Sequence, residues 1–234
     1  MRNLVLVSIG LACLVAGSSH AGVLAEHSGS ADPATELGLA ASGDTGNGWA
    51  VDDGGVAAWA IVDNSTSPLT YQHAMTASEL ADAAAYGWSV TASLKLLDVN
   101  KPYNDSVMIY ARINDLRHVV QFSTDDAAVP TVRIHGSNGW VNEYTVGSAG
   151  YHEYKLIYDP VSDSSDFFVD GIERLTNIPI DHDDGTNYVY FGSALAGDTG
   201  QGAYYSAFEL ATIPEPLTAA FLALGGLALV RKRS

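Results

Sequence analysis

The chain has 234 residues, of which 47% are hydrophobic, and its 27 Asp and Glu outnumber 11 Lys and Arg for a formal net charge of −16. Outside residues 1–21 and 214–234 there are 7 basic and 26 acidic residues, so this body carries a formal charge of −19. A surface this acidic repels nucleic acid and anionic lipid, and suits cations or neutral ligands. The charge therefore excludes nucleic acid as a partner.

Residues 1–21, MRNLVLVSIGLACLVAGSSHA, predict a secretory signal peptide. Arg2 precedes an apolar stretch of suitable length, and Ser19-His20-Ala21 forms a small-residue cleavage site. The alternatives are a buried N-terminal helix and lipid attachment at Cys13, for which Gly10 stands where Leu is usual. Because Cys13 is the only cysteine, the mature chain would have neither a disulfide nor thiol chemistry.

The body of the chain predicts an all-β domain. Residues 22–48 are rich in Ala, Gly, Ser and Asp, and we expect an exposed lead-in. From Trp49 onward, short apolar runs alternate with turn residues, which is typical of strands. In chain order, strands are expected at 57–62, 69–73, 88–97, 106–113, 118–123, 129–135, 143–146, 151–159, 166–169, 188–192 and 203–210.

Residues 76–85 favour a helix instead, with Thr76 as N-cap, Glu79 completing a capping box and Gly87 ending the helix. Asp170-Gly171 predicts a two-residue hairpin, because both residues tolerate positive φ. In the strand at 151–159 we expect His152 on the core face, buried and hydrogen bonded. A single short helix among about eleven strands predicts an antiparallel two-sheet sandwich.

The domain at 49–212 resembles the concanavalin A-like lectin and glucanase jelly roll, and within it the laminin G-like bacterial modules. The resemblance is carried by GWAVDDGGVAAWAIVD, SELADAAAYGWSVTASLKLLD, YHEYKLIYDP with DFFVDGIERL, and VYFGSALAGDTGQGAYYSAFEL. It implies two curved sheets, one of them concave and commonly facing a ligand. It implies no activity, since the fold serves both enzymes and binders.

Sugar binding requires an aromatic platform flanked by planar polar groups. We expect Trp140 and Asn142 to share one face of a loop or strand edge. Tyr103 and Asn104, in a proline-containing loop, are a second candidate pair. Either aromatic ring could instead cap the core.

The arginines are notable because basic residues are scarce in this domain. Arg112 and Arg117, together with Arg133, could bind an acidic sugar. The alternative is that they pair with the abundant carboxylates.

The sequence predicts no catalytic residue. Glycoside hydrolysis needs two carboxylates about 5 to 9.5 Å apart, which jelly-roll glucanases place on one strand as Glu-x-Asp-x-Glu, and no such run exists here. The segment 181–185, DHDDG, follows Pro179 and predicts a loop. Its Asp181, Asp183 and Asp184 could bind calcium, and the alternative is a solvated acidic turn. No cofactor is required.

Two similar glycine-rich segments precede strands. Residues 43–49, GDTGNGW, recur as GDTGQGA at 197–203. We expect the two loops to lie side by side at one end of the sandwich, and Asp44 and Asp198 at opposite ends would contradict this. With Ser42 the first segment also matches the sialidase Asp-box pattern, but it does so only once and we interpret the match as chance.

Residues 213–234, IPEPLTAAFLALGGLALVRKRS, resemble a PEP-CTERM sorting segment. The apolar run at 217–230 would cover roughly 21 Å as a helix, short of the ~30 Å hydrocarbon core. The resemblance implies cleavage by an exosortase-type membrane protease after transient inner-membrane contact, in Gram-negative-type bacteria that make exopolysaccharide. An ordinary C-terminal anchor is the alternative. The matching residues are Pro214, Glu215, Pro216, Arg231, Lys232 and Arg233.

Together these features predict an exported, non-catalytic module that binds glycan at the cell surface or in exopolysaccharide. One alternative is a glycoside hydrolase or sialidase-like enzyme whose site is assembled from separate strands. Another is a purely structural matrix protein. A converging carboxylate pair on the concave sheet would favour the enzyme, a Trp/Tyr platform without one the binder, and a featureless sheet the scaffold.

Overall fold

The structure is a computed structural model that describes residues 22–65, 67–97, 99, 107–125, 129–193 and 200–213. The predicted signal peptide and sorting segment lie outside the described residues, as do Tyr103, Asn104 and Asp198. Within the described ranges, no helix has the length and apolar character needed to cross a membrane.

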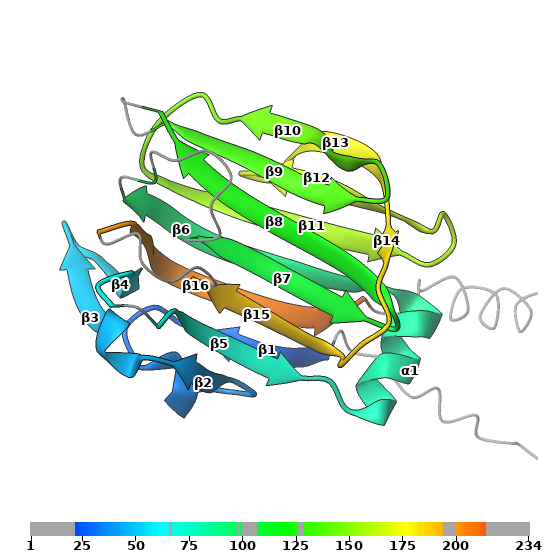
Figure 1. Ribbon diagram of the computed structural model, residues 1–234, viewed down its shortest axis with the longest axis horizontal. Coiled ribbons are helices and arrows are strands. Elements are labelled where there is room, and N and C mark those ends of the chain that lie inside the picture. The colour runs from blue at the N-terminus through cyan, green and yellow to red at the C-terminus, as the bar shows by residue number, and fades with distance from the viewer. Residues whose placement is uncertain are drawn as a thin grey trace, which may run out of the picture. The chain divides into compact units, whose positions relative to one another are not determined.

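The described residues form a jelly-roll sandwich of two antiparallel sheets with one α-helix, which confirms the predicted fold class (Figure 1). In order across the first sheet, the strands are β13 (Ile172–Pro179), β12 (Ser164–Val169), β11 (Tyr151–Asp159), β6 (Trp88–Leu97), β16 (Gly202–Thr212), β4 (Val56–Val62) and β3 (Gly48–Asp53), with β1 (Val23–His27) paired to β16. Across the second sheet they are β10 (Gly139–Thr145), β9 (Pro130–Gly136), β8 (Leu116–Thr124), β7 (Met108–Ile113), β15 (Tyr188–Gly192), β5 (Leu69–Ala74) and β2 (Ala40–Gly43), with β14 (Asp181–His182) paired to β8.

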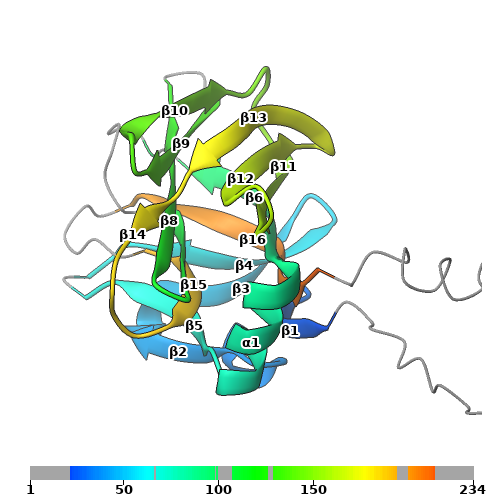
Figure 2. The same ribbon diagram turned by 90° about the vertical axis from the view of Figure 1, so that its right-hand side faces the viewer.

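Most predicted elements are present. Strands β6, β11 and β15 have the predicted bounds, and the remaining predicted strands differ by one to four residues at an end. Helix α1 (Ala77–Tyr86) begins with the predicted capping box, in which Thr76 N–H donates to Glu79 Oε2 at 2.6 Å. It ends at Gly87, whose φ is 88°, and α1 lies across one end of the sandwich (Figure 2). Asp170 and Gly171, with φ of 53° and 72°, turn the hairpin between β12 and β13.

The prediction of an exposed lead-in at 22–48 is wrong. Strand β1 pairs with β16 and β2 pairs with β5, while the 3₁₀ turns η1 (Pro33–Thr35) and η2 (Thr45–Asn47) lie between the strands. Ala25 and His27 are buried because β1 joins the first sheet by pairing with β16. This partner strand lies some 180 residues later in the chain. The sequence did not reveal this pairing because β1, VLAEH, is only five residues long and its partner strand is distant in the chain.

Inward-facing aromatic rings join the two sheets. Phe191 of β15 is fully buried, with its ring centroid 4.4 Å from Phe208 and 4.9 Å from Tyr205, both on β16 of the opposite sheet. The same ring stacks on Tyr71 of β5 at 5.7 Å. The core is therefore continuous from one sheet to the other.

His152 lies on the core face of β11, as predicted. Its Nδ1 is 2.8 Å from Asp170 Oδ2 and its Nε2 is 3.0 Å from the Ser148 carbonyl oxygen. These contacts, together with its low exposure, confirm a buried, hydrogen-bonded histidine.

The described parts of the two glycine-rich segments meet at the end of β4. Asn64 N–H donates to Asn47 Oδ1 at 3.2 Å, and Asp63 N–H donates to the Gln201 carbonyl oxygen at 2.9 Å. Residues from both segments thus bind the same stretch of backbone. These contacts support the prediction that the two glycine-rich segments lie side by side, while the position of Asp198 stays a prediction.

His118 of β8 gives the fold a dependence on pH. Its side chain is fully buried in the core, 5.5 Å from the Trp88 ring centroid, and its Nε2 is 3.1 Å from Ser165 Oγ. Burial lowers the pKa of His118 from 6.5 to about 4, with the charge of Asp181 opposing and that of His135 reinforcing the shift. Between these pH values the unfolded chain binds a proton that the folded protein does not, so stability falls as pH falls from 6.5 toward 4.

The variant His118→Gln is therefore expected to lose less stability than the wild type between pH 6.5 and pH 4.5. Urea unfolding at several pH values in this range measures the difference, and circular dichroism checks that the variant folds. Equal loss of stability in both proteins would show that His118 does not titrate as its burial requires.

Candidate functional site

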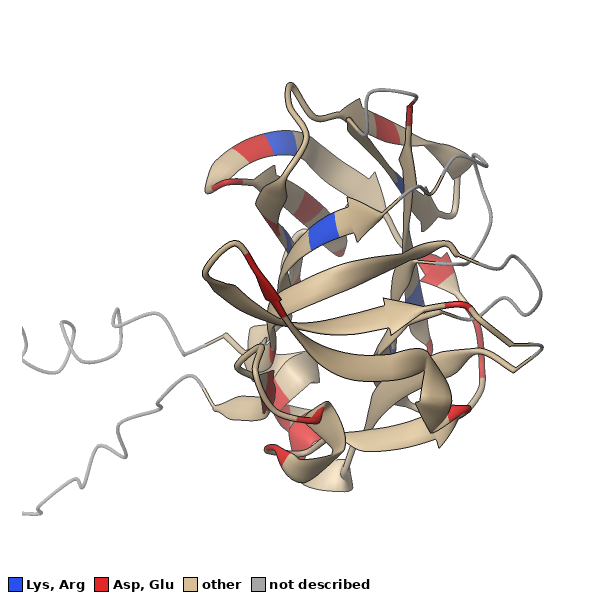
Figure 3. Cartoon of the chain, turned by 90° about the vertical axis from the view of Figure 1, so that its left-hand side faces the viewer, with Lys and Arg blue, Asp and Glu red and all other residues tan. Residues whose placement is uncertain are grey.

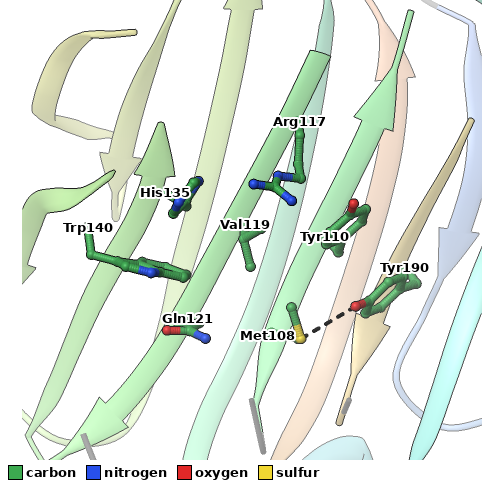
Figure 4. Close-up of a pocket in the computed structure, with 8 residues that line it drawn as sticks. All are labelled: Met108, Tyr110, Arg117, Val119, Gln121, His135, Trp140 and Tyr190. Atoms are coloured by element: carbon green, nitrogen blue, oxygen red, sulfur yellow. Dashed lines mark hydrogen bonds between the residues drawn. The ribbon is translucent and has the colours of Figure 1, made fainter. Parts of the chain in front are cut away.

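The outer face of the second sheet contains a hollow of about 270 Å³ (Figure 4). Five strands supply the described residues of its walls and floor, so ladder hydrogen bonds fix the backbone that carries these residues. On a strand, side chains two residues apart share a face, so β7 and β8 each present several residues to the hollow. The lining residues are Met108, Tyr110, Arg117, Val119, Gln121, His135, Trp140 and Tyr190.

The sheet register places the centre of the hollow in one row. Val119 of β8 is paired with His135 of β9 on one side and with Tyr110 of β7 on the other. Tyr110 is in turn paired with Tyr190 of β15. Because these are cross-strand partners, the row runs perpendicular to the strands.

Three stacked tyrosines form one end of the row. The ring centroid of Tyr110 is 5.0 Å from that of Tyr190 and 5.4 Å from that of Tyr188, and the planes are nearly parallel. The Arg112 guanidinium lies over Tyr110 at 5.5 Å and over Tyr188 at 5.7 Å. Burial, above all, raises the pKa of Tyr110 from its usual value. Its hydroxyl is therefore neutral at physiological pH. Together the rings and the cation make a rigid aromatic surface.

Trp140 forms the opposite end. Its ring centroid is 4.8 Å from that of His135, edge to face, and the Arg133 guanidinium lies 5.0 Å from the indole. Figure 4 shows the indole reaching from β10 toward Val119 and Gln121. The pKa of His135 lies below its usual value, mainly because the side chain is buried and also because Arg117 is positively charged. The negative charge of Asp181 opposes this shift but does not cancel it.

The predicted pairing of Trp140 with Asn142 on one face is wrong. The register between β9 and β10 shifts between Gly139 and Asn142, and this bulge turns the two side chains apart. Asn142 lies opposite Ile134, and its amide donates to the Ile134 carbonyl oxygen at 3.3 Å and to Asn138 Oδ1 at 2.9 Å. Asn142 does not line the hollow.

The three arginines on this face pair with carboxylates, which confirms the alternative stated for them. Arg112 Nη2 is 2.5 Å and Arg117 Nη1 is 3.0 Å from the same atom, Asp183 Oδ2. Arg117 also binds Asp181, which is its cross-strand partner because residues 181–182 form strand β14 rather than the expected loop. Arg133 Nε is 3.7 Å from a Glu143 carboxylate oxygen.

The predicted calcium site gains no support from this arrangement. Two of its three proposed ligands, Asp181 and Asp183, are held by guanidinium groups. Among the described residues there is no group of three His, Cys, Asp or Glu side chains that could hold a metal ion. Calcium binding by Asp181, Asp183 and Asp184 stays a prediction.

A second hollow, of about 320 Å³, lies on the outer face of the first sheet. Its polar lining includes Thr91, Ser93, Glu153 and Lys155, and among the described lining residues the one aromatic, Phe208, is buried in the core. The described lining therefore offers hydroxyl, carboxylate and ammonium groups but no exposed ring on which a sugar could stack.

No protein-family model matches the chain, and no curated protein matches it. Among solved structures, the receptor-binding domain of botulinum neurotoxin C/D mosaic serotype is similar, with a TM-score of 0.51 and 9% identity over 87% of this chain and 51% of that one. Two mutants of HCR/D also give TM-scores of 0.51 at 8% identity, each over 88% of this chain. The likeness is one of fold alone. The chain spans about half the length of these structures.

Sequence reasoning found Trp140 and Arg117 but missed most of the hollow. Tyr110 escaped notice because β7 is buried on both faces, so no alternation marks its outer side, and Tyr190 of β15 was not predicted to be part of a site. The available signal was Tyr188-Val189-Tyr190, in which two tyrosines of one strand share a face. Arg112, also predicted, lies over the Tyr110 and Tyr188 rings and does not line the hollow.

Proposed function

We propose that this domain binds carbohydrate in the hollow between Trp140 and Tyr190. The observation that carries the proposal is the combination of aromatic walls with planar polar groups, which is the pattern that sugar rings require. A pyranose ring has apolar faces that stack on aromatic side chains, and hydroxyl groups at its edge. Arg117 and Gln121 supply polar atoms on either side of the apolar floor at Val119.

The same geometry supports a binder over an enzyme. No carboxylate is present among the described residues that line the hollow, whereas glycoside hydrolysis uses two. Among the described residues, Asp181 and Asp183 contact Arg117, which lines the hollow, and both carboxylates are bound to arginines. A hollow with aromatic walls also differs from the featureless sheet expected of a scaffold. A receptor-binding domain of similar fold agrees with a role in recognition.

The full-length chain applied to an array of glycans tests this proposal. We expect retention on at least one carbohydrate, no release of product from it, and loss of retention in Trp140→Ala. No retention by the wild type, or retention that Trp140→Ala leaves unchanged, would contradict the proposed site. Release of a hydrolysis product by the wild-type protein would instead favour the hydrolase.

We also propose that the chain is exported and sorted through residues 213–234, which places the glycan-binding domain at the cell surface or in exopolysaccharide. The support is the Pro-Glu-Pro sequence, the short apolar run and the basic end. We expect an epitope tag placed after Ser234 to be lost in a host that has an exosortase. The tag should be kept when the exosortase gene is deleted or when Pro214 and Pro216 are replaced by Ala. Equal retention with and without the exosortase would contradict the proposal.

A further inference from the structure

The long axis of the hollow runs across the strands. Trp140, His135, Val119, Tyr110 and Tyr190 lie on β10, β9, β8, β7 and β15, which are successive neighbours in the sheet. Neighbouring strands are about 4.8 Å apart, so the row from β10 to β15 extends roughly 19 Å. This is longer than one sugar ring. A chain of several rings is needed to contact Trp140 and Tyr190 together.

The row has an apolar centre and polar margins. Val119 is the centre of the floor, and Gln121 and Arg117 stand two residues to either side of it on β8, on the same face. In Figure 4 these two side chains lie on opposite sides of the row. Hydroxyl groups that project from both edges of a flat sugar chain would therefore meet polar atoms on both sides.

The charges beside the row balance one another. Three of the six Lys and Arg among the described residues, Arg112, Arg117 and Arg133, lie on this face, and the other three lie on strands of the first sheet. Lys and Arg are sparse over the fold as a whole (Figure 3). Each of the three arginines has a carboxylate partner, at Asp183, at Asp181 with Asp183, and at Glu143. An acidic ligand would have to displace one of these carboxylates and approach a domain of strongly negative charge.

We propose that the ligand is the interior of a linear, uncharged glycan, bound across the strands with one ring stacked on Trp140 and another on the Tyr110–Tyr190 pair. This inference rests on the proposed carbohydrate-binding function and adds the length, direction and charge of the ligand. The arginines act here as hydrogen-bond donors whose charge is already neutralised. Along the described part of the row, the arginines that a neutral chain would meet are each paired with a carboxylate.

Calorimetric titration of the full-length chain tests length and charge together. The probes are linear β-1,3- and β-1,4-linked neutral oligomers of glucose, mannose and xylose from one to six units, with uronate oligomers of the same lengths. Among neutral probes that bind, affinity should rise at least tenfold from the monomer to the tetramer and then level off. A label on the reducing end of the hexamer should not change its affinity, because the interior of the chain is bound.

Two variants probe the two ends of the row. Trp140→Ala should weaken hexamer binding roughly thirtyfold and Tyr190→Ala about tenfold, while each changes the affinity for a dimer much less. Trp49→Ala is the matched control, since Trp49 is a 40% exposed tryptophan on β3 of the other sheet, and it should bind as the wild type does.

The outcomes separate the two proposals. Binding of a monomer as tight as that of the hexamer, or tighter binding of uronates than of neutral oligomers, would overturn the inference and leave carbohydrate binding in place. Blocking by the reducing-end label would overturn interior binding in the same way. Absence of binding to every probe, neutral and acidic, would count against both proposals.

Discussion

Trp140→Ala is expected to weaken glycan binding by about 2 kcal/mol, roughly thirtyfold in Kd, because buried tryptophan anchors commonly contribute this much to binding. The Trp140 ring contacts both His135 and the Arg133 guanidinium, so it is pre-oriented and little entropy is lost on binding. The measurement is a calorimetric titration of wild type and variant with the same oligosaccharide.

The control for this variant is Trp49→Ala, which removes an exposed tryptophan from the first sheet. It should leave Kd unchanged and show that loss of an indole does not weaken binding in general. If Trp49→Ala weakened binding as much as Trp140→Ala did, the outer face of the second sheet would not be the binding surface.

Phe191→Ala is expected to lower the free energy of unfolding by about 3 to 5 kcal/mol, the range found for Phe removed from well-packed cores. The ring is fully buried and contacts aromatic residues of both sheets, so its removal leaves a cavity where the sheets meet. Such a loss is a large part of the 5 to 15 kcal/mol that typically stabilises a domain. Urea unfolding followed by circular dichroism measures it.

Val161→Ala provides the comparison, because the Val161 side chain is 93% exposed and its truncation should change stability by less than about 0.5 kcal/mol. A loss below about 1 kcal/mol in Phe191→Ala would mean that the aromatic cluster does not join the two sheets as described.

The sequence predicted strands most accurately where one face of the strand is buried and the other is exposed to solvent. In β11, Tyr154 and Leu156 are buried, while the intervening Lys155 is partly exposed, and the alternating pattern predicted the strand with its bounds. In β1, VLAEH, only five residues form the strand, and the pairing with β16 depends on residues far along the chain. Local periodicity contains no information on such a partner.

The candidate site was only partly predictable for the same reason. Trp140 stood out by its residue type, but the bulge in β10 that separates it from Asn142 is set by pairing with β9. The scarcity of basic residues drew attention to Arg117, whereas its binding to Asp181 depends on a short strand that no hydrophobic pattern marks. Tyr110 and Tyr190 become neighbours only through the register of β7 with β15.

The most direct test of the central claim is chemical-shift mapping of the isotope-labelled full-length chain titrated with a neutral oligosaccharide that it binds. The account predicts that the largest changes occur at the Trp140 indole N–H and at backbone amides of β7, β8, β9 and β15. Changes concentrated instead on the first sheet, around Thr91 and Ser93, with the Trp140 indole unmoved, would contradict it.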